Sequence, residues 1–281
     1  MSTTATAGPP PASAATAAAP VQARARRPGR PGRWSFGGYL LGFAALFFFW
    51  HAAATWIVPS VLFPPPATVA VHMVKLLQEG VLLDHVAWSL QRIMLGFSIG
   101  SLLGVTIGLL MGSFRPVRVL LEPFTEFLRF IPSVAMITIA VIWLGIGEES
   151  KVFLIIYTTI FIVIIATCAG VAGVDRDKIR AARSLGANRW QVFFHVTIPA
   201  TVPAILTGMR IAMANSFTTI VAAELVAANE GLGKMLWDAR MFMLVEDIFV
   251  ALLCLGFMGF LVDRLFRWAT FRFAGKYAPV V

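Results

Sequence analysis

Charged residues are scarce in this chain, and acidic residues are scarcer than basic ones. Only 13% of the 281 residues are charged while 58% are hydrophobic, with 14 Asp and Glu against 23 Lys and Arg. Water-soluble domains carry about 25% charged residues. The composition therefore excludes an ordinary soluble fold, and the mean hydropathy of +0.81 indicates a protein that resides in a lipid bilayer.

The residues that build most catalytic and metal sites are rare or dispersed. The two cysteines, Cys168 and Cys254, fall inside apolar runs, so we expect neither a disulfide nor a thiolate metal site. The four histidines include no pair at metal-ligand spacing. The sequence has no Gly-x-x-x-x-Gly-Lys-[Ser/Thr] phosphate loop, which excludes ATP hydrolysis by that route. We expect no catalytic residue, no metal, no cofactor and no enzymatic activity.

Long apolar runs are plentiful. A helix that crosses the roughly 30 Å hydrocarbon layer needs about 20 apolar residues. Six runs approach this length, the third being the shortest: residues 37–58, 87–112, 132–147, 152–173, 198–226 and 246–266. The sequence predicts an all-α, polytopic membrane protein with about six transmembrane helices.

The distribution of Lys and Arg predicts which side of the membrane each loop faces. With the N-terminus inside, 17 of these residues fall in cytoplasmic segments and 4 in external ones. Cytoplasmic loops are enriched in Lys and Arg, so both termini are expected in the cytoplasm. The net charge of +9 is then a topology signal and gives no reason to expect nucleic acid as a partner, whereas membrane lipid is expected.

The domain organisation follows from these runs. Residues 1–36 combine Ala, Pro, Thr and Gly with an arginine cluster, and we expect a disordered cytoplasmic tail there. A transmembrane domain is expected over residues 37–268 and a second cytoplasmic tail over 269–281. Two segments outside the spans have helical spacing of apolar residues: 64–80, expected on the outer surface, and 120–131, expected along the inner interface.

A charged loop over residues 175–199 separates two apolar runs. It reads Arg180-Ala-Ala-x-x-x-Gly186, then nine residues, then Val196-Thr-Ile-Pro199. Residues 179–185 favour a short helix, and Gly186 stands where a left-handed residue would end it. Asn188 is suited to cap a second short helix over residues 189–196 at an angle to the first, and Pro199 suits the first turn of the next span.

The two alanines in this loop distinguish it from an ordinary connection. Ala181 and Ala182 present almost no side chain, so a partner surface can approach the backbone closely, while several arginines surround them. This favours a docking element. The alternative is a plain cytoplasmic loop whose arginines only set the membrane orientation.

Polar residues within the fifth run are candidates for a solute pathway, because ionisable groups inside spans are costly and often functional. Arg210 and Glu224 both lie in this run, fourteen residues apart, with Asn215 and Thr218 between them. The alternative is that Arg210 reaches the inner head groups, Glu224 pairs with a cation of an outer loop, and the hydroxyls bond their own helix. Arg92 and Thr158 carry less weight, since Arg92 can reach outward to the membrane surface.

Several motifs together resemble the permease subunits of ABC importers. They are Leu128-Arg-Phe-Ile-Pro-Ser133, Trp143-Leu-Gly-Ile-Gly147, Ala182-Arg-Ser-Leu-Gly186, Ala223-Glu-Leu-Val226 and Glu230-Gly-Leu-Gly233. The match covers roughly residues 60–275 and is closest to the branch that imports nitrate, aliphatic sulfonates, taurine and related small anions. The resemblance implies the type I importer fold in a bacterial inner membrane.

The resemblance also implies partners. In that family, the loop that matches residues 180–199 inserts into a separate ATP-binding subunit, a solute-binding protein delivers the substrate, and two permease chains form a homodimer. Ala181, Ala182, Gly186 and Pro199 match the family pattern, whereas Arg180 replaces a usual glutamate. Two alternatives remain: a secondary transporter driven by an ion gradient, which predicts acidic residues near span midplanes, and a membrane enzyme.

Overall fold

A computed structural model describes residues 35–57 and 60–274. Within these residues the structure is helical and has no strand. The chain divides into two units, residues 1–47 and 48–281. In the first unit the described residues form the beginning of helix α1 (Ser35–Ala52), so the expected disordered tail lies outside the described residues except for its last two positions.

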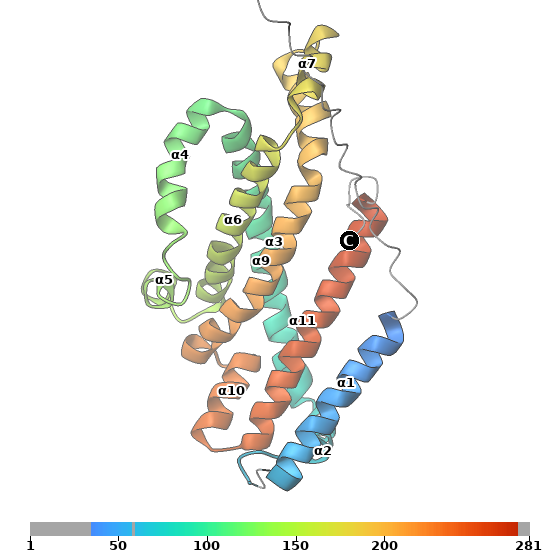
Figure 1. The fold of residues 1–281 in the computed structure, drawn as a ribbon. Helices are drawn as coiled ribbons and strands as arrows, with labels where there is room; N and C mark the ends of the chain where they lie inside the picture. Colours follow the sequence, from blue (N-terminus) through green and yellow to red (C-terminus); the bar gives the residue numbers. More distant parts are fainter. Residues whose placement is uncertain (1–34, 58–59, 275–281) are drawn as a thin grey trace, which may run out of the picture. The chain divides into compact units, whose positions relative to one another are not determined.

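The second unit contains the remaining helices (Figure 1). They are the end of α1, the π-helix η1 (Ala53–Ile57), α2 (Pro66–Gln78), α3 (Val81–Ser113), α4 (Arg115–Leu128), α5 (Met136–Leu144), α6 (Glu148–Ala172), α7 (Arg176–Ser184), α8 (Arg189–Val192), the π-helix η2 (Phe193–Thr197), α9 (Ile198–Ala227), α10 (Leu232–Met241) and α11 (Val245–Ala274). Among the described residues, five stretches are long and apolar enough to cross a membrane: α1 with η1, α3, α6, α8 to α9, and α11. The predicted all-α membrane fold is confirmed.

A row of glycines joins α3 to α6. Glycine occupies every fourth position of α3 from Gly96 to Gly112. A Cβ atom added at Gly96 would lie 2.6 Å from the Ile155 Cβ, and one at Gly112 would lie 2.7 Å from the Val171 Cβ. Small residues allow membrane helices to pack backbone to backbone. The residue numbers of the contacting pairs increase together along the two helices, so α3 and α6 run parallel. The start of α6 therefore lies at the opposite end of the bundle from the end of α3.

The chain must therefore cross back between α3 and α6, and α4 makes this crossing. In Figure 1, α4 runs along the bundle from the end of α3 towards α5, which is seen almost end-on. With 14 residues α4 is about 21 Å long, and the 9 residues of α5 are about 13 Å long. Two expectations need correction: residues 132–147 hold a short transverse helix in place of a third span, and residues 120–131 descend along the bundle.

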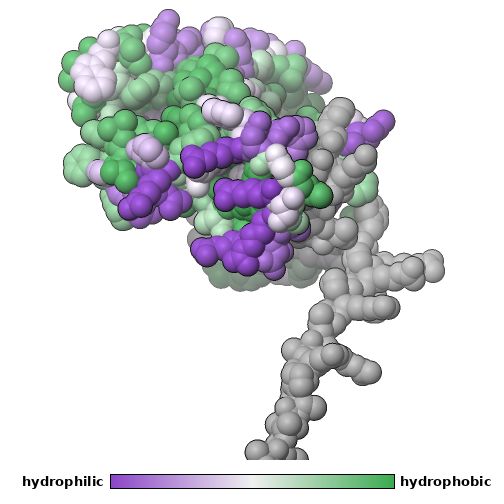
Figure 2. Space-filling view, turned by 90° about the horizontal axis from the view of Figure 1, so that it is seen from above, coloured by the Kyte–Doolittle hydropathy of each residue, from purple (hydrophilic) through white to green (hydrophobic). Residues whose placement is uncertain are grey.

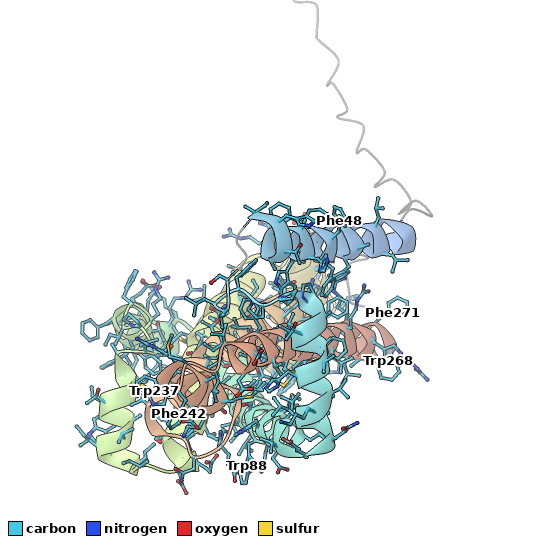
Figure 3. The ribbon with its side chains drawn as sticks, turned by 90° about the horizontal axis from the view of Figure 1, so that it is seen from below. Phe48, Trp88, Trp237, Phe242, Trp268 and Phe271 are labelled. Atoms are coloured by element: carbon cyan, nitrogen blue, oxygen red, sulfur yellow. The ribbon has the colours of Figure 1, made fainter. Side chains whose placement is uncertain are left out.

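The third core helix, α9, packs against α6 in the opposite direction. A Cβ atom at Gly170 would lie 2.6 Å from the Ala204 Cβ, and one at Gly208 would lie 2.3 Å from the Ala166 Cβ. Helices α3, α6 and α9 thus form a closely packed core. At its lower end in Figure 1, Trp88 of α3, Trp237 of α10 and Phe242, which directly follows α10, are exposed (Figure 3). Exposed aromatic side chains at one level are typical of a membrane interface.

The predicted cytoplasmic C-terminal tail begins inside a helix. α11 continues to Ala274, six residues past the predicted boundary at residue 268. The remainder of that tail, residues 275–281, lies outside the described residues. The segment expected as an outer amphipathic helix is α2, and the His72 side chain of α2 forms a hydrogen bond with Asp247 at the start of α11.

Candidate functional site

The first candidate site is the predicted docking element, residues 175–199, at the upper end of the bundle in Figure 1. Its first helix, α7, starts at Arg176, three residues before the predicted start. The cause is Asp175, whose side chain accepts a hydrogen bond of 2.9 Å from the Asp177 N–H and so caps the first turn. Arg180 lies on the exposed face and pairs with Asp177 at 3.5 Å.

The turn after α7 confirms the left-handed conformation predicted for Gly186. Its φ angle is +86°, in the left-handed region. The Gly186 N–H donates to the Arg183 carbonyl at 2.9 Å, and the Ala187 N–H donates to the Ala182 carbonyl at 3.1 Å. This pair of bonds is the Schellman motif, which satisfies the last carbonyls of a helix and redirects the chain. Both predicted alanines lie on α7, Ala181 exposed and Ala182 half-buried.

The second predicted helix is only partly separate. Asn188 caps α8 through a reciprocal pair with Gln191, each side chain accepting from the other's backbone N–H at 2.8 Å. From there α8, η2 and α9 continue without a break, contrary to the prediction of an isolated short helix over residues 189–196. A π turn precedes Pro199, which lacks an N–H and whose ring would crowd the carbonyl four residues earlier in a regular α-helix.

Aromatic side chains fix the docking element to the bundle. The ring of Phe114, at the corner between α3 and α4, lies 5.6 Å from the rings of both Trp190 and Phe193. On the outer side, Leu185 and Trp190 are 89% and 59% exposed. Figure 2 views this end and shows hydrophobic side chains beside hydrophilic ones. The aromatic anchor was not foreseen, because Phe114 lies far from the loop in the sequence.

Arg210, the first candidate pathway residue, is held by α11. Its Nε and Nη2 donate to the two carboxylate oxygens of Asp263 at 2.6 and 3.1 Å. Such a bidentate pair fixes the guanidinium geometry. The Arg210 charge is therefore paired within the protein, with a partner that the sequence did not indicate. A role of Arg210 in the solute pathway stays a prediction.

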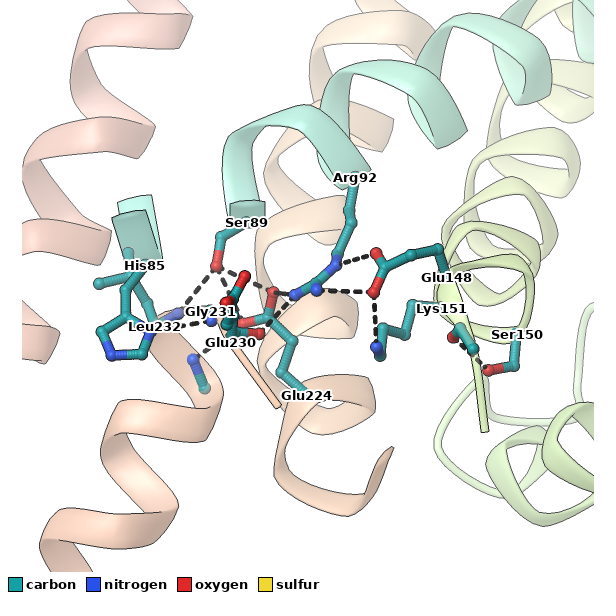
Figure 4. Close-up of polar contacts among 12 residues, drawn as sticks. His85, Ser89, Arg92, Glu148, Ser150, Lys151, Glu224, Glu230, Gly231 and Leu232 are labelled. Atoms are coloured by element: carbon teal, nitrogen blue, oxygen red, sulfur yellow. Dashed lines mark hydrogen bonds and ion pairs between the residues drawn. The ribbon is translucent and has the colours of Figure 1, made fainter. Parts of the chain in front are cut away.

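Glu224, the second charged candidate, is fully buried at the opposite end of the core (Figure 4). The Arg92 Nη1 donates to its Oε1 at 2.7 Å, and the Ser89 hydroxyl lies 2.9 Å from both carboxylate oxygens. Arg92 is only 3% exposed and also binds Glu148 of α6 through Nε and Nη2. The expectation that Arg92 reaches outward is wrong, and the partner of Glu224 belongs to α3, not to an outer loop.

The same cluster holds the turn between α9 and α10. The Gly233 N–H donates to the Glu224 Oε2 at 2.8 Å, and the Leu232 N–H donates to the Ser89 Oγ at 2.9 Å. Gly231 has a φ of +121°, and a Cβ there would lie 2.4 Å from the Glu224 carboxyl carbon. The glycines of the Glu230-Gly-Leu-Gly233 motif thus make room for a buried carboxylate that accepts a hydrogen bond from the Gly233 N–H.

The uncharged candidates for the solute pathway are exposed, unlike Glu224. Asn215 and Thr218 are both exposed on α9, and the Asn215 amide donates to the Ile211 carbonyl at 3.0 Å. The neighbouring Thr219 faces inward, where its hydroxyl lies 3.0 Å from that of Thr158 and 3.3 Å from that of Ser133. Within residues 35–57 and 60–274, no group of His, Cys, Asp and Glu is arranged to hold a metal ion.

Comparison with protein families decides the class. Residues 100–275 match the model of the binding-protein-dependent transport system inner membrane component. The chain belongs to this family. The permease is 41% identical over 210 residues to a probable ABC transporter permease protein of Brucella melitensis, covering 75% of this chain and 85% of that one. It is also 39% identical over 220 residues to the taurine transport system permease protein of Escherichia coli, covering 76% and 80%.

A third relative and a solved structure extend the comparison. The nitrate import permease protein of Synechocystis is 38% identical over 176 residues, covering 63% of the permease and 64% of that chain. An inward-facing MetNI methionine ABC transporter structure superposes with a TM-score of 0.54 at 16% identity, covering 67% of the permease and 97% of that chain. At this identity the match supports the type I importer fold and nothing about the substrate.

Proposed function

We propose that the permease is the translocating subunit of an ATP-driven importer for a small anion. A separate ATP-binding subunit docks on residues 180–199, a solute-binding protein delivers the substrate from outside, and two copies of the permease form a homodimer around the pathway. The ATP-binding subunit supplies the energy, because the permease sequence has no phosphate loop. Both termini are cytoplasmic, in a bacterial inner membrane.

The observation that carries the proposal is the shape of the docking element. A capped helix, a Schellman turn at Gly186 and a second capped helix form a protruding element in which most turns are hydrogen-bonded. Its outer side exposes Leu185, Trp190 and Phe194 together with arginines. Exposed apolar residues surrounded by charge are characteristic of protein–protein contacts. The small side chains of Ala181 and Ala182 allow a partner to approach α7.

The core provides a path for movement from this element into the membrane. α8 continues through η2 into α9 without a loop, and α9 packs on α6 through Gly170 and Gly208. A force applied at the docking element therefore acts directly on α9 and, through α6, on α3. Closure of two ATP-binding subunits would switch the paired bundles between inward-open and outward-open states as rigid bodies.

The proposed substrate class rests on the relatives. Their names specify taurine, aliphatic sulfonates, nitrate and bicarbonate for those proteins. All four bear an oxygen-rich anionic group, so a small anion is the shared chemistry. The proposed inward orientation of the docking element agrees with the cations on it and with Arg115 and Arg118 at the start of α4, which lies at the same end (Figure 1).

Co-purification of the permease with its ATP-binding subunit tests the proposal. In the wild-type complex, the two proteins should purify together and couple ATP hydrolysis to uptake. Ala182→Arg places a long cation on α7 and should reduce uptake while the permease stays in the membrane. Wild-type uptake by this variant would contradict docking on α7. The ion-gradient alternative predicts that the purified permease alone moves solute in vesicles, and such activity would overturn the proposal.

A further inference from the structure

The structure holds a cavity of about 270 Å³ between the α4–α5 connection and α6. We call it the α4–α6 cavity; its polar lining residues are Arg129, Ser133, Tyr157 and Thr158, and its apolar wall includes Phe161 and Ile165. Thr158 lies ten residues into α6, about 15 Å from the start of the helix and close to its middle. Transporters commonly bind their solutes near this depth.

Hydroxyl groups from three segments converge at this cavity. Thr158 of α6 and Ser133 of the α4–α5 connection both line it, and both lie within hydrogen-bond distance of the Thr219 hydroxyl of α9, at 3.0 and 3.3 Å. Each hydroxyl donates one hydrogen bond and can accept others. A small rotation about their C–O bonds lets one or more of these hydroxyls donate a hydrogen bond to a ligand in the cavity.

Arg129 adds a cation to the same lining. Its Nε and Nη2 both donate to one oxygen of Glu126, at 3.1 and 2.6 Å, and its guanidinium lies 4.6 Å from the Phe130 ring centre. Within the described residues Nη1 has no hydrogen-bond acceptor. Arg129 is 34% exposed and Glu126 is 54% exposed, so the pair is weakly held and the guanidinium can turn to an incoming anion.

We propose that the α4–α6 cavity is the anion subsite of the permease and that it accepts a small organic anion with a sulfonate-like head and a short apolar tail. This inference rests on the proposed function. Arg129 and the hydroxyls of Ser133 and Thr158 bind the oxygen atoms of the head, and Phe161 and Ile165 contact the tail. The volume is below the roughly 300 Å³ at which sites for drug-sized ligands begin, which restricts the tail to a few carbon atoms.

Charged thiol reagents test this subsite without any partner subunit. Thr158→Cys is introduced into a background carrying Cys168→Ala and Cys254→Ala, which removes both native thiols. The purified permease is treated in separate reactions with 2-sulfonatoethyl methanethiosulfonate, an anion, and with its trimethylammonioethyl counterpart, a cation. Because both reagents attack the same thiol, the ratio of their rates reports on local charge and not on thiol reactivity. After correction for a small free thiol in solution, the anion should react about tenfold faster, as expected for one favourable charge contact.

Three controls separate the subsite from general accessibility. Ser60→Cys, an exposed position outside the cavity, should give a rate ratio near one. Adding Arg129→Gln to Thr158→Cys should remove the preference for the anion. Butanesulfonate should slow labelling at Thr158→Cys and not at Ser60→Cys, while butylammonium should have no effect. Ser133→Cys provides a second thiol in the same cavity if Thr158→Cys does not fold.

Equal rates for the two reagents at both cavity thiols, or labelling that butanesulfonate leaves unchanged, would overturn the subsite. Protection by nitrate as strong as that by butanesulfonate would overturn the apolar-tail part of the proposal. These outcomes are distinguishable from failure of the proposed function. Labelling uses the permease alone, whereas docking of the ATP-binding subunit is judged by co-purification.

Discussion

Arg92 of α3 and Glu224 of α9 form an ion pair inside the bundle, with Nη1 and Oε1 2.7 Å apart and the side chains 3% and 0% exposed. The two residues are 132 positions apart in the sequence. The Arg92 guanidinium lies between Glu224 and the half-exposed Glu148 of α6 and binds both, so it connects all three core helices (Figure 4). The carboxylate in turn receives the Gly233 N–H, which fixes the turn into α10.

Removing one member of this pair should be costly. Arg92→Met leaves the Glu224 carboxylate buried with only Ser89 and the Gly233 N–H, and we expect the free energy of unfolding in detergent micelles to fall by about 3–5 kcal/mol. The double variant Arg92→Met with Glu224→Gln should lose less, because no unpaired charge remains. Lys75→Met is the matched control, because Lys75 and Glu79 form an exposed pair at 3.9 Å. The free energy of unfolding of this variant should equal that of the wild type. Equal losses in the single and double variants would contradict a charge-pairing role.

The glycine row on α3 predicts a second effect on stability. A Cβ at Gly104 would lie 2.9 Å from the Ile160 carbonyl oxygen and 2.8 Å from the Val163 Cβ, so Gly104→Val must push α3 and α6 apart. We expect a loss of about 1–3 kcal/mol, the usual cost of overpacking, seen as a lower midpoint of thermal unfolding. Gly256→Val on α11 is the control, because no atom lies within 4 Å of a Cβ there. If both valine variants unfold at the same temperature, close packing at Gly104 is not what joins the two helices.

Local patterns made part of this molecule predictable. Apolar runs located the five long spans, and the positions of Gly186 and Asn188 indicated the Schellman turn and the helix cap, because both motifs depend on residues within a few positions of each other. Asp175 carried an equally local capping signal that was overlooked. The glycines at every fourth position of α3 are another local pattern, typical of a packing face, from which the sequence analysis drew no prediction.

Other features depend on contacts that no local pattern encodes. The pairing of Arg210 with Asp263 joins residues 53 positions apart, and the cluster around Glu224 joins residues more than 130 apart. The crossing between α3 and α6 was misplaced for a different reason. Residues 132–147 are more apolar than α4, whose sequence includes Arg115, Arg118, Glu122 and Glu126, so hydropathy favoured residues 132–147.

The Arg210–Asp263 pair predicts matching phenotypes for its two members. If Arg210 serves to hold α11, then Arg210→Gln and Asp263→Asn should reduce stability by similar amounts, about 1 kcal/mol for a partly exposed pair, and the double variant should lose little more than either single one. A double-mutant cycle on thermal unfolding in detergent measures this coupling. A variant of Arg210 that abolishes uptake at full stability, while Asp263→Asn transports normally, would instead return Arg210 to the solute pathway.

The left-handed turn at Gly186 predicts how docking depends on backbone shape. No atom lies within 4 Å of a Cβ added at Gly186, so a substitution there acts through the φ of +86° and not through a clash. Gly186→Val should disfavour this conformation, whereas Gly186→Asn should tolerate it, because Asn adopts left-handed geometry far more readily than a β-branched residue. We expect Gly186→Val to reduce the amount of ATP-binding subunit that co-purifies with the permease by about tenfold, corresponding to about 1.4 kcal/mol of turn strain, with Gly186→Asn close to wild type. Both variants should reach the membrane in equal amounts, since the turn lies outside the core helices. Equal co-purification with Val and Asn would show that the angle between α7 and α8 is not what the ATP-binding subunit recognises.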